Sequence, residues 1–382
     1  MNFKFFALLF FSLSASAQIN LLSLPGEQLA TFDIPGGTGA TPTAISPTGE
    51  VVGYYTNVSA AQTWSFIRMP SGEITTFTVP NSLLTVATGV NAAREVVGYY
   101  AFEDGTGDDQ TYLQVGFRRT ATGVFTSDYQ IGTEGYPMGI NATGQVVGYY
   151  LSEEEAWQSF IEQEGGEDWT EFNVTGDDPD NIGTRALAIS DGGIVVGYYD
   201  NADQTPEHGF LEQMAEPATD SSAAIPTGPI VNFDFPNATD TIPSAVNLAG
   251  VIVGTSDQGG WLRQANGQMV GLGTPSLGEF FPVAINDVEE VAGACTGAAP
   301  ADDPGATVTP TIGCLVSGTT YYQFAVPDAA TTFPMAMNAA GAITGWWVDA
   351  YEGAIHGFVI QKVYFLTDPR GPVRLRLNGT DL

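Results

Sequence analysis

A stretch of eleven residues with the same order of apolar and polar positions recurs seven times along the chain. It opens with an apolar anchor, continues through Asn or Ser and a short polar segment, and ends in a run of apolar residues around a glycine, as in 140–150. The seven anchors are Ile45, Val90, Ile140, Ile189, Val246, Ile285 and Met337. Eight residues after each anchor the chain has Gly53, Gly98, Gly148, Gly197, Gly254, Gly293 and Gly345. A repeat at intervals of roughly 50 residues indicates an array or a propeller, and it outweighs any local interpretation of the chain.

Each repeat predicts four short strands. Asn at the start and Gly at the end of a four-residue segment favour a type I turn between the first and second strands. The second strand, 146–150 in the third repeat, is apolar at consecutive positions, which predicts burial on both faces. A small–aromatic–aliphatic triplet such as 159–161 follows on the third strand, and a more polar fourth strand such as 74–80 closes the unit. Four antiparallel strands of this kind are typical of one propeller blade.

The first strand of the repeat has a signature of its own. Three residues before the anchor, proline recurs at Pro42, Pro137, Pro243, Pro282 and Pro334. One residue before the anchor, every repeat has Ala or Gly. Because proline is tolerated only at the start or the edge of a sheet strand, we expect the first strand to be the innermost one, bordering a central channel. Small residues would fit that crowded axis.

These patterns predict an all-β fold, a seven-bladed β-propeller of four-stranded antiparallel blades. The segment 29–35 matches a fourth strand but precedes the first repeat. We therefore expect this N-terminal strand to close the ring by completing the seventh blade. The chain then divides into a signal peptide at 1–17, the seven-repeat propeller at 18–366 and a C-terminal tail at 367–382.

The N-terminal segment has the composition of an export signal. Lys4 precedes the apolar run 5–13, and Ala15, Ser16 and Ala17 stand before Gln18. The apolar run is too short to span a bilayer as an anchor. We expect the mature protein to be soluble, secreted or periplasmic, and a monomer.

Charge excludes two classes of partner. The formal net charge is −32, and the loss of Lys4 with the signal would make it −33. Nucleic acids and anionic membranes are bound through basic patches, so neither is an expected partner. An acidic exported surface indicates solubility, salt tolerance or cation binding.

The two cysteines lie in register with aromatic positions of the repeat. Cys295 occupies the place of the second tyrosine, as in Tyr150, and Cys314 that of the third-strand aromatic, as in Phe160. In the sixth repeat a cross-strand aromatic pair is therefore replaced by a cysteine pair. In an oxidising compartment this predicts a disulfide between Cys295 and Cys314.

The sequence contains no catalytic or cofactor-binding motif that we can identify. The only two histidines, His208 and His356, occupy the same repeat position, which favours a structural role. Nucleophile-elbow, zinc-protease and phosphate-loop motifs are absent, so no catalytic residue, cofactor or metal ligand is assigned. The acidic segments 104–109 and 176–181 offer clustered oxygen ligands, but neither matches a twelve-residue calcium loop. Solvated loops remain the alternative there.

A candidate ligand site lies where the repeats diverge. Four residues before the anchors the chain has Thr41, Val86, Tyr136, Arg185, Ile242, Phe281 and Phe333. If the register holds, these side chains form one ring at the channel mouth, and Arg185 is its only charge. An arginine beside Tyr136, Phe281 and Phe333 could bind a carboxylate or a sugar acid. The alternative is that Arg185 neutralises a local excess of acid.

The repeat resembles a known family. Its Phe-Asp-Ile-Pro segment at 32–35, its Ile-Asn-x-x-Gly-x-Val-Val-Gly-Tyr-Tyr segment and the His-Gly-Phe-Leu segment at 208–211 are similar to the bacterial extracellular repeat family called HAF, after a His-Ala-Phe triplet. Here Gly stands in place of Ala, and the histidine is present only at His208 and His356. The resemblance covers nearly the whole mature chain and implies an exported, repeat-built protein. It implies no activity and no catalytic residues.

Two function classes follow. The leading hypothesis is an exported, non-enzymatic propeller that binds an extracellular protein, a glycan or a surface component. The alternative is a carbohydrate-active hydrolase or lyase that uses carboxylates at one propeller face.

Overall fold

The computed structural model describes residues 17–18, 29–104, 111–129, 134–153, 156–162, 169–174, 183–200, 206–214, 229–273, 279–296, 311–361, 365–366, 374–377 and 380–381. These residues form strands, turns and irregular connections, with no helix among them. The predicted all-β fold is therefore confirmed. Most of the predicted export signal lies outside the described residues.

The strands group into seven antiparallel units of four. The first three units are β3 (Gly37–Ile45), β4 (Val51–Asn57), β5 (Gln62–Arg68) and β6 (Ile74–Phe77); β7 (Leu84–Val90), β8 (Val96–Asp104), β9 (Thr111–Arg119) and β10 (Phe125–Tyr129); and β11 (Glu134–Ile140), β12 (Val146–Leu151), β13 (Trp157–Glu162) and β14 (Trp169–Phe172). The fourth and fifth are β15 (Gly183–Ile189), β16 (Ile194–Asp200), β17 (Glu207–Gln213) and β18 (Val231–Phe233); and β19 (Thr241–Val246), β20 (Ile252–Ser256), β21 (Gly259–Arg263) and β22 (Met269–Gly271).

The last two units follow the same plan with one exchange. The sixth contains β23 (Phe280–Ile285), β24 (Val291–Thr296), β25 (Thr311–Ser317) and β26 (Thr320–Phe324), and the seventh contains β27 (Ala329–Met337), β28 (Ile343–Asp349) and β29 (Ile355–Ile360). The fourth strand of the seventh unit is β2 (Leu29–Phe32), which pairs antiparallel with β29 from Leu29 opposite Ile360 to Phe32 opposite Gly357. The predicted pairing of the N-terminal strand with the last repeat is thus present.

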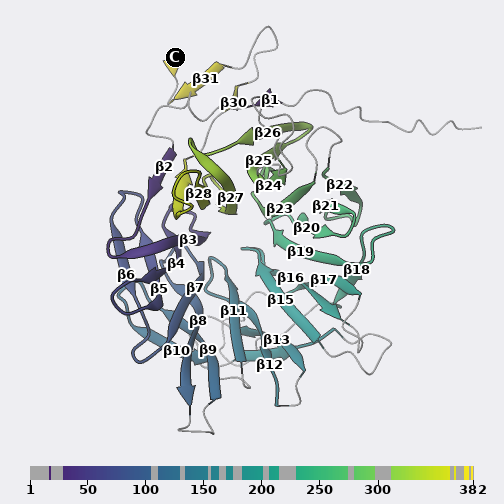
Figure 1. The fold of residues 1–382 in the computed structure, drawn as a ribbon. Coiled ribbons are helices and arrows are strands. Elements are labelled where there is room, and N and C mark those ends of the chain that lie inside the picture. The colour runs from purple at the N-terminus through teal and green to yellow at the C-terminus, as the bar shows by residue number, and fades with distance from the viewer. Residues whose placement is uncertain are drawn as a thin grey trace, which may run out of the picture.

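Four short strands lie outside this plan. β1 (Ala17–Gln18) pairs parallel with β26. In the tail, β30 (Phe365–Leu366) pairs with β31 (Arg374–Leu377), which pairs with β32 (Thr380–Asp381). In Figure 1 the seven units follow one another in chain order around a common centre, from violet through teal and green to yellow.

The predicted turn between the first and second strands is present in hydrogen-bonded form. In the third unit the Gly144 amide donates to the Asn141 carbonyl at 3.0 Å. The Asn141 side-chain oxygen also accepts a hydrogen bond from the Gln145 amide at 2.9 Å. Asparagine therefore satisfies a backbone donor that the tight turn would otherwise leave unpaired.

The glycine in the middle of every second strand is required by close packing. A Cβ atom at Gly148 would lie 2.1 Å from the Tyr136 carbonyl oxygen of the first strand and 2.9 Å from the Phe160 ring of the third. The other six units show the same collision with the first-strand carbonyl. The invariance of this glycine thus has a steric cause.

The first strands depart from the expectation for proline in one respect. Proline lies in an edge strand, as predicted, but in the interior of that strand rather than at its start. A β-bulge follows directly, with register shifts between Pro42 and Ala44 in the first unit and at the same place in all seven. The bulge accommodates a residue that cannot donate to a sheet ladder.

Bulged residues and turn residues tie each unit to the next. The Thr43 hydroxyl donates to the Ala87 carbonyl at 2.8 Å, and Thr88 bonds Pro137 in the same way at 2.6 Å. The Asn338 side chain of the seventh unit donates to the Ser46 carbonyl of the first unit at 2.9 Å. The last unit is therefore bonded to the first.

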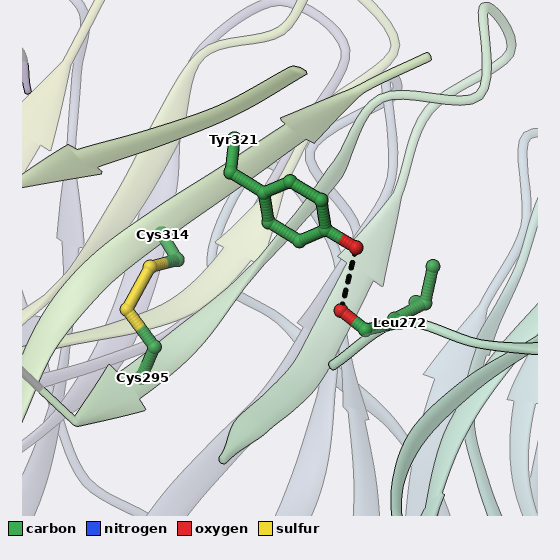
Figure 2. The surroundings of a disulfide bond; sticks show 4 residues. All are labelled: Leu272, Cys295, Cys314 and Tyr321. Atoms are coloured by element: carbon green, nitrogen blue, oxygen red, sulfur yellow. Dashed lines mark hydrogen bonds between the residues drawn. A yellow bond between two sulfur atoms is a disulfide. The ribbon is translucent and has the colours of Figure 1, made fainter. Parts of the chain in front are cut away.

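The predicted disulfide is present between Cys295 on β24 and Cys314 on β25, with 5.9 Å between the α-carbons. Figure 2 shows it beside Tyr321, whose hydroxyl donates to the Leu272 carbonyl at 2.7 Å. Because Leu272 follows the last strand of the fifth unit, this hydrogen bond joins the fifth unit to the sixth next to the covalent cross-link.

Candidate functional site

The seven positions predicted to form a ring lie on the first strands, each opposite the second strand of its own unit. Tyr136 is paired in register with Tyr149, Arg185 with Tyr198, and Phe333 with Trp346. Side chains at paired positions lie on the same face of a sheet, so each predicted residue has a second-strand neighbour. In the third, fourth and seventh units that neighbour is aromatic.

Rings from the second, third and fourth units form one continuous group. Tyr99 contacts Tyr136 edge-on with centroids 5.1 Å apart, and Tyr136 stacks on Tyr149 at 5.2 Å. Tyr149 in turn meets Trp157 at 5.4 Å. Arg185 extends the group into the fourth unit, with its guanidinium carbon 5.1 Å from the Trp157 ring centroid and 5.2 Å from that of Tyr198. We call these six residues, Tyr99, Tyr136, Tyr149, Trp157, Arg185 and Tyr198, the aromatic–arginine cluster.

Arg185 is paired within the protein. Its Nη1 lies 2.8 Å from Oδ2 of Asp200, and its side chain is 15% exposed. Asp200 fits beneath it because Gly183 has no side chain: a Cβ there would lie 2.2 Å from Asp200 Oδ1. Neutralisation of a local carboxylate, the alternative interpretation of Arg185, matches this ion pair.

The phenols of the cluster stay protonated at neutral pH. Burial, together with the negative charge that Tyr198 would acquire, raises the pKa of Tyr149 to about 12 against a lowering by Arg185. Burial and the hydrogen bond to Glu134 raise the pKa of Tyr136 further. The pKa of Tyr198 is also raised, chiefly by burial. These hydroxyls can therefore donate hydrogen bonds across the physiological range.

Two carboxyl groups beside the cluster have different environments. Asp200 is 5% exposed and bound to Arg185. Glu207 is its register partner across β16 and β17. Burial and the negative charge of Asp240 raise the pKa of Glu207, and Arg185 only partly opposes them. An ionised carboxylate next to a carboxyl group that holds its proton is an arrangement used in acid–base catalysis.

The two remaining predicted residues lie in other units. Phe333 stacks on Trp346, with ring centroids 5.3 Å apart and planes 6° from parallel. Phe281, on β23, is 39% exposed. The contacts of the described residues join Tyr136 to Arg185 through Trp157, but they join neither Phe281 nor Phe333 to that group.

Three members of the site were missed from the sequence. Tyr149 belongs to a recurring tyrosine position and was interpreted as structural. Trp157 follows an acidic segment that has a helical pattern in isolation, although it begins β13 as the repeat register requires. Asp200 stands directly after the Tyr-Tyr pair of β16, and its pairing with Arg185 across the strands was the signal that could have revealed it.

Both histidines have structural partners. The His208 Nδ1 lies 2.8 Å from Asp234 Oδ1, and the ring stacks on Tyr199. The His356 Nδ1 lies 2.6 Å from Asp33 Oδ1, and the ring stacks on Trp347. Within the described part of the chain, no group of three or more acidic, histidine or cysteine side chains could hold a metal ion. The candidate calcium segments 104–109 and 176–181 lie almost entirely outside the described residues.

In the part of the chain that the structure describes, no helix is long and apolar enough to cross a membrane. Comparison with protein-family models and with curated proteins finds no match for the sequence. The resemblance to the HAF repeats therefore stays a prediction.

Two solved structures are similar in fold at low identity. Puromycin hydrolase is 12% identical with a TM-score of 0.45, over 89% of this chain and 58% of the hydrolase chain, so this chain spans less than two thirds of it. A triple arginine-to-alanine mutant of AofleA from Arthrobotrys oligospora is 12% identical with a TM-score of 0.38, over 79% of this chain and 89% of the other. Neither likeness bears on what this protein binds.

Proposed function

We propose that this protein is an exported, closed seven-bladed β-propeller that binds a glycan at the aromatic–arginine cluster without transforming it. The observation that carries the proposal is the cluster itself. Its ring contacts run without interruption from the second unit to the fourth, and they include two of the positions at which the repeats diverge.

Contacts between the first and last units support a closed ring. The Asn338 side chain bonds Ser46, and Phe32 of the seventh unit meets Phe66 of the first with ring centroids 5.7 Å apart. Strand β3 also lies against β27, β28 and β29. A closed ring leaves no unit with an unpacked face, which is the usual reason that repeat arrays need capping.

Export is supported by the disulfide and by the N-terminal composition. A disulfide between Cys295 and Cys314 persists in oxidising compartments such as the periplasm or the extracellular medium. The predicted signal at 1–17 would direct the chain there.

The chemistry of the cluster suits a sugar ligand. Aromatic faces stack on the apolar C–H faces of sugar rings, while phenols, carboxylates and a guanidinium fix hydroxyl groups by hydrogen bonds. Phe281 and Phe333 hold the same repeat position in the sixth and seventh units and would extend the contact surface around the ring. Because Arg185 is already bound to Asp200, an anionic sugar would compete with that carboxylate, and its binding would weaken with added salt.

The test is incubation of the purified protein with a panel of neutral, amino and acidic polysaccharides, scoring both binding and product release. We expect retention of at least one glycan with no new reducing ends. Trp157→Ala should weaken that binding more than tenfold. Trp169→Ala is the matched control, because Trp169 is a half-exposed tryptophan on the last strand of the same unit. Equal losses in both variants, or no binding by the parent protein, would contradict the proposal.

The role of Arg185 is decided by a second variant. If Arg185 contacts the ligand, Arg185→Ala abolishes binding and leaves the melting temperature nearly unchanged. If it serves only as the counter-ion of Asp200, the same change leaves a buried carboxylate unpaired, lowers the melting temperature and spares binding.

A hydrolase or lyase is the second candidate, favoured by the Asp200 and Glu207 pair. In that case Glu207 would donate a proton to the leaving oxygen, and product would accumulate with time. Glu207→Gln should then abolish product release while glycan binding persists.

A further inference from the structure

One position of the third strand, three residues after its small residue, faces the preceding unit in every described case. In three units it is an arginine whose guanidinium lies over a phenylalanine of the preceding unit: Arg68 over Phe32, Arg119 over Phe77 and Arg263 over Phe233. In the third unit it is Glu162, whose Oε1 lies 3.5 Å from Nη1 of Arg118 in the second unit. Each of these charges has a partner at the joint it enters.

The fourth unit has Glu212 at this position, and its partner is missing. Glu212 is 2% exposed, and its Oε2 has no hydrogen-bond partner among the described residues. The buried side chains that fill this joint between the third and fourth units are apolar: Val147, Ile161, Phe172, Val174, Ala186, Val195, Phe210 and Met214.

A single difference between repeats explains the missing partner. Arg118 stands two residues after the small residue of its third strand, and the same position in the third unit is Ile161. The segments 163–168, 175–182 and 215–228, which adjoin these strands in sequence, contain no Lys, Arg or His. No cation of the neighbouring repeats is therefore available to Glu212.

The charged groups on the strands around Glu212 are engaged elsewhere. Glu162 on β13 pairs with Arg118, and Glu171 on β14 accepts a hydrogen bond from Tyr150. Arg185 on β15 pairs with Asp200 on β16. On β17 itself, Glu207 lies at the far end of the strand, and His208 pairs with Asp234. An ionised Glu212 would thus be an isolated charge in an apolar joint.

We infer that the joint between the third and fourth units is a pH-sensitive contact, closed while Glu212 is protonated and loosened when this buried side chain ionises. Burial raises the pKa of Glu212 from 4.5 to about 7. The packed joint therefore prefers the protonated form, and its stability is greatest below about pH 4.5. That stability is lost as the pH rises through about 7 and is constant above it.

The joint also carries the aromatic–arginine cluster. Trp157 of the third unit contacts Arg185 of the fourth at 5.1 Å, and the Ala186 amide donates to the Ser159 hydroxyl at 2.9 Å across the same boundary. Loosening this boundary would separate the two halves of the cluster. The inference itself concerns the joint and does not rest on glycan binding.

Native-state hydrogen exchange by mass spectrometry tests it on the full-length mature protein. Between about pH 5 and pH 8, after correction for intrinsic exchange rates, we expect the opening constant of peptides covering β13, β15 and β17 to rise on the order of 100-fold. Peptides of the fifth and sixth units should show no comparable change. Glu212→Gln should remove the rise, because the amide does not ionise.

The neighbouring joint supplies a matched control and a rescue. Glu162→Gln leaves Arg118 with one carboxylate fewer, so it should loosen the joint between the second and third units without creating a pH-dependent rise at β17. Ile161→Arg copies the Arg118 position and should keep the third joint closed at pH 8. The inference is overturned if wild-type exchange at β13, β15 and β17 does not change with pH, or if Glu212→Gln retains the change. Should Glu212→Gln fail to fold, the wild-type profile alone decides between these outcomes.

Discussion

At the fourth residue after each anchor, the backbone is in the left-handed region in all seven units. Five units have glycine there, at Gly49, Gly144, Gly193, Gly250 and Gly341. The other two have Arg94 with φ of 61° and Glu289 with φ of 60°. Both side chains reach the preceding unit, since Arg94 pairs with Glu50 at 3.2 Å and Glu289 accepts a hydrogen bond from Gln264 at 3.2 Å. Contacts between units thus explain why two repeats depart from glycine.

Glu289→Gly should stabilise the protein. A left-handed non-glycine residue costs roughly 1–2 kcal/mol, and the added flexibility of glycine in the unfolded chain offsets about 0.5–1 kcal/mol of the relief. The exposed hydrogen bond to Gln264 contributes little, so we expect a gain of about 0.5 kcal/mol in urea denaturation.

Arg94→Gly is the informative comparison. It relieves the same strain but leaves the buried Glu50 carboxylate without its ion pair, so we expect no gain or a loss. A stabilisation equal to that of Glu289→Gly would show that the Arg94–Glu50 contact adds nothing.

Gly148→Ala should destabilise the third unit severely. The new methyl group would lie 2.1 Å from the Tyr136 carbonyl oxygen and 2.8 Å from the α-carbon of Pro137, both of them backbone atoms that cannot move independently. We expect a loss of about 3 kcal/mol or more by chemical denaturation. Gly273→Ala serves as control, because a Cβ there meets nothing within 4 Å. Similar losses in both variants would refute the steric explanation.

At the scale of elements, the sixth unit differs from the others by its covalent cross-link. The disulfide joins β24 and β25 across a sequence separation of 19 residues, where the third unit has Tyr150 and Phe160 packed together. Two small sulfur-containing side chains fill less volume than two rings, and the bond supplies part of what the packing does not.

Replacing both Cys295 and Cys314 with Ala should lower the free energy of unfolding by roughly 3 kcal/mol. Urea denaturation measures the change, and non-reducing peptide mapping of exported wild-type protein should recover the two cysteines in one linked peptide pair. Unchanged stability of the double variant, or free thiols in the exported protein, would contradict this expectation.

At the scale of the molecule, β2 connects the N-terminal segment to the last repeat. Phe32 lies against Phe66 of the first unit, and the Arg68 guanidinium lies 5.1 Å from its ring. A side chain that contacts both ends of the array couples them only if the ring is closed.

Phe32→Ala should therefore weaken two distant segments together. We expect a loss of about 2 kcal/mol, with faster hydrogen exchange in both β5 and β29 and in no other unit to the same degree. Faster exchange confined to β29 would indicate an open array in which the first unit does not depend on β2.

The repeat pattern alone was sufficient for much of this fold. Turns, strand order, the place of β2 and the Cys295–Cys314 pair all follow from register, because strand periodicity and turn chemistry are local and the seven copies reinforce one another. The positions of Tyr136 and Arg185 on first strands were predicted on the same basis.

Side-chain partners across the strands and between the units were decided only by the tertiary structure. The pairing of Arg185 with Asp200 required two strands to meet and Gly183 to leave room. The separation of Phe281 and Phe333 from the cluster depended on which units are neighbours. The unpaired Glu212 has a local sequence close to that of Glu162, and only the unit before it, with Ile161 in place of Arg118, makes the difference. Register determines where a residue lies on its strand, whereas charge and burial depend on what the neighbouring unit places against it.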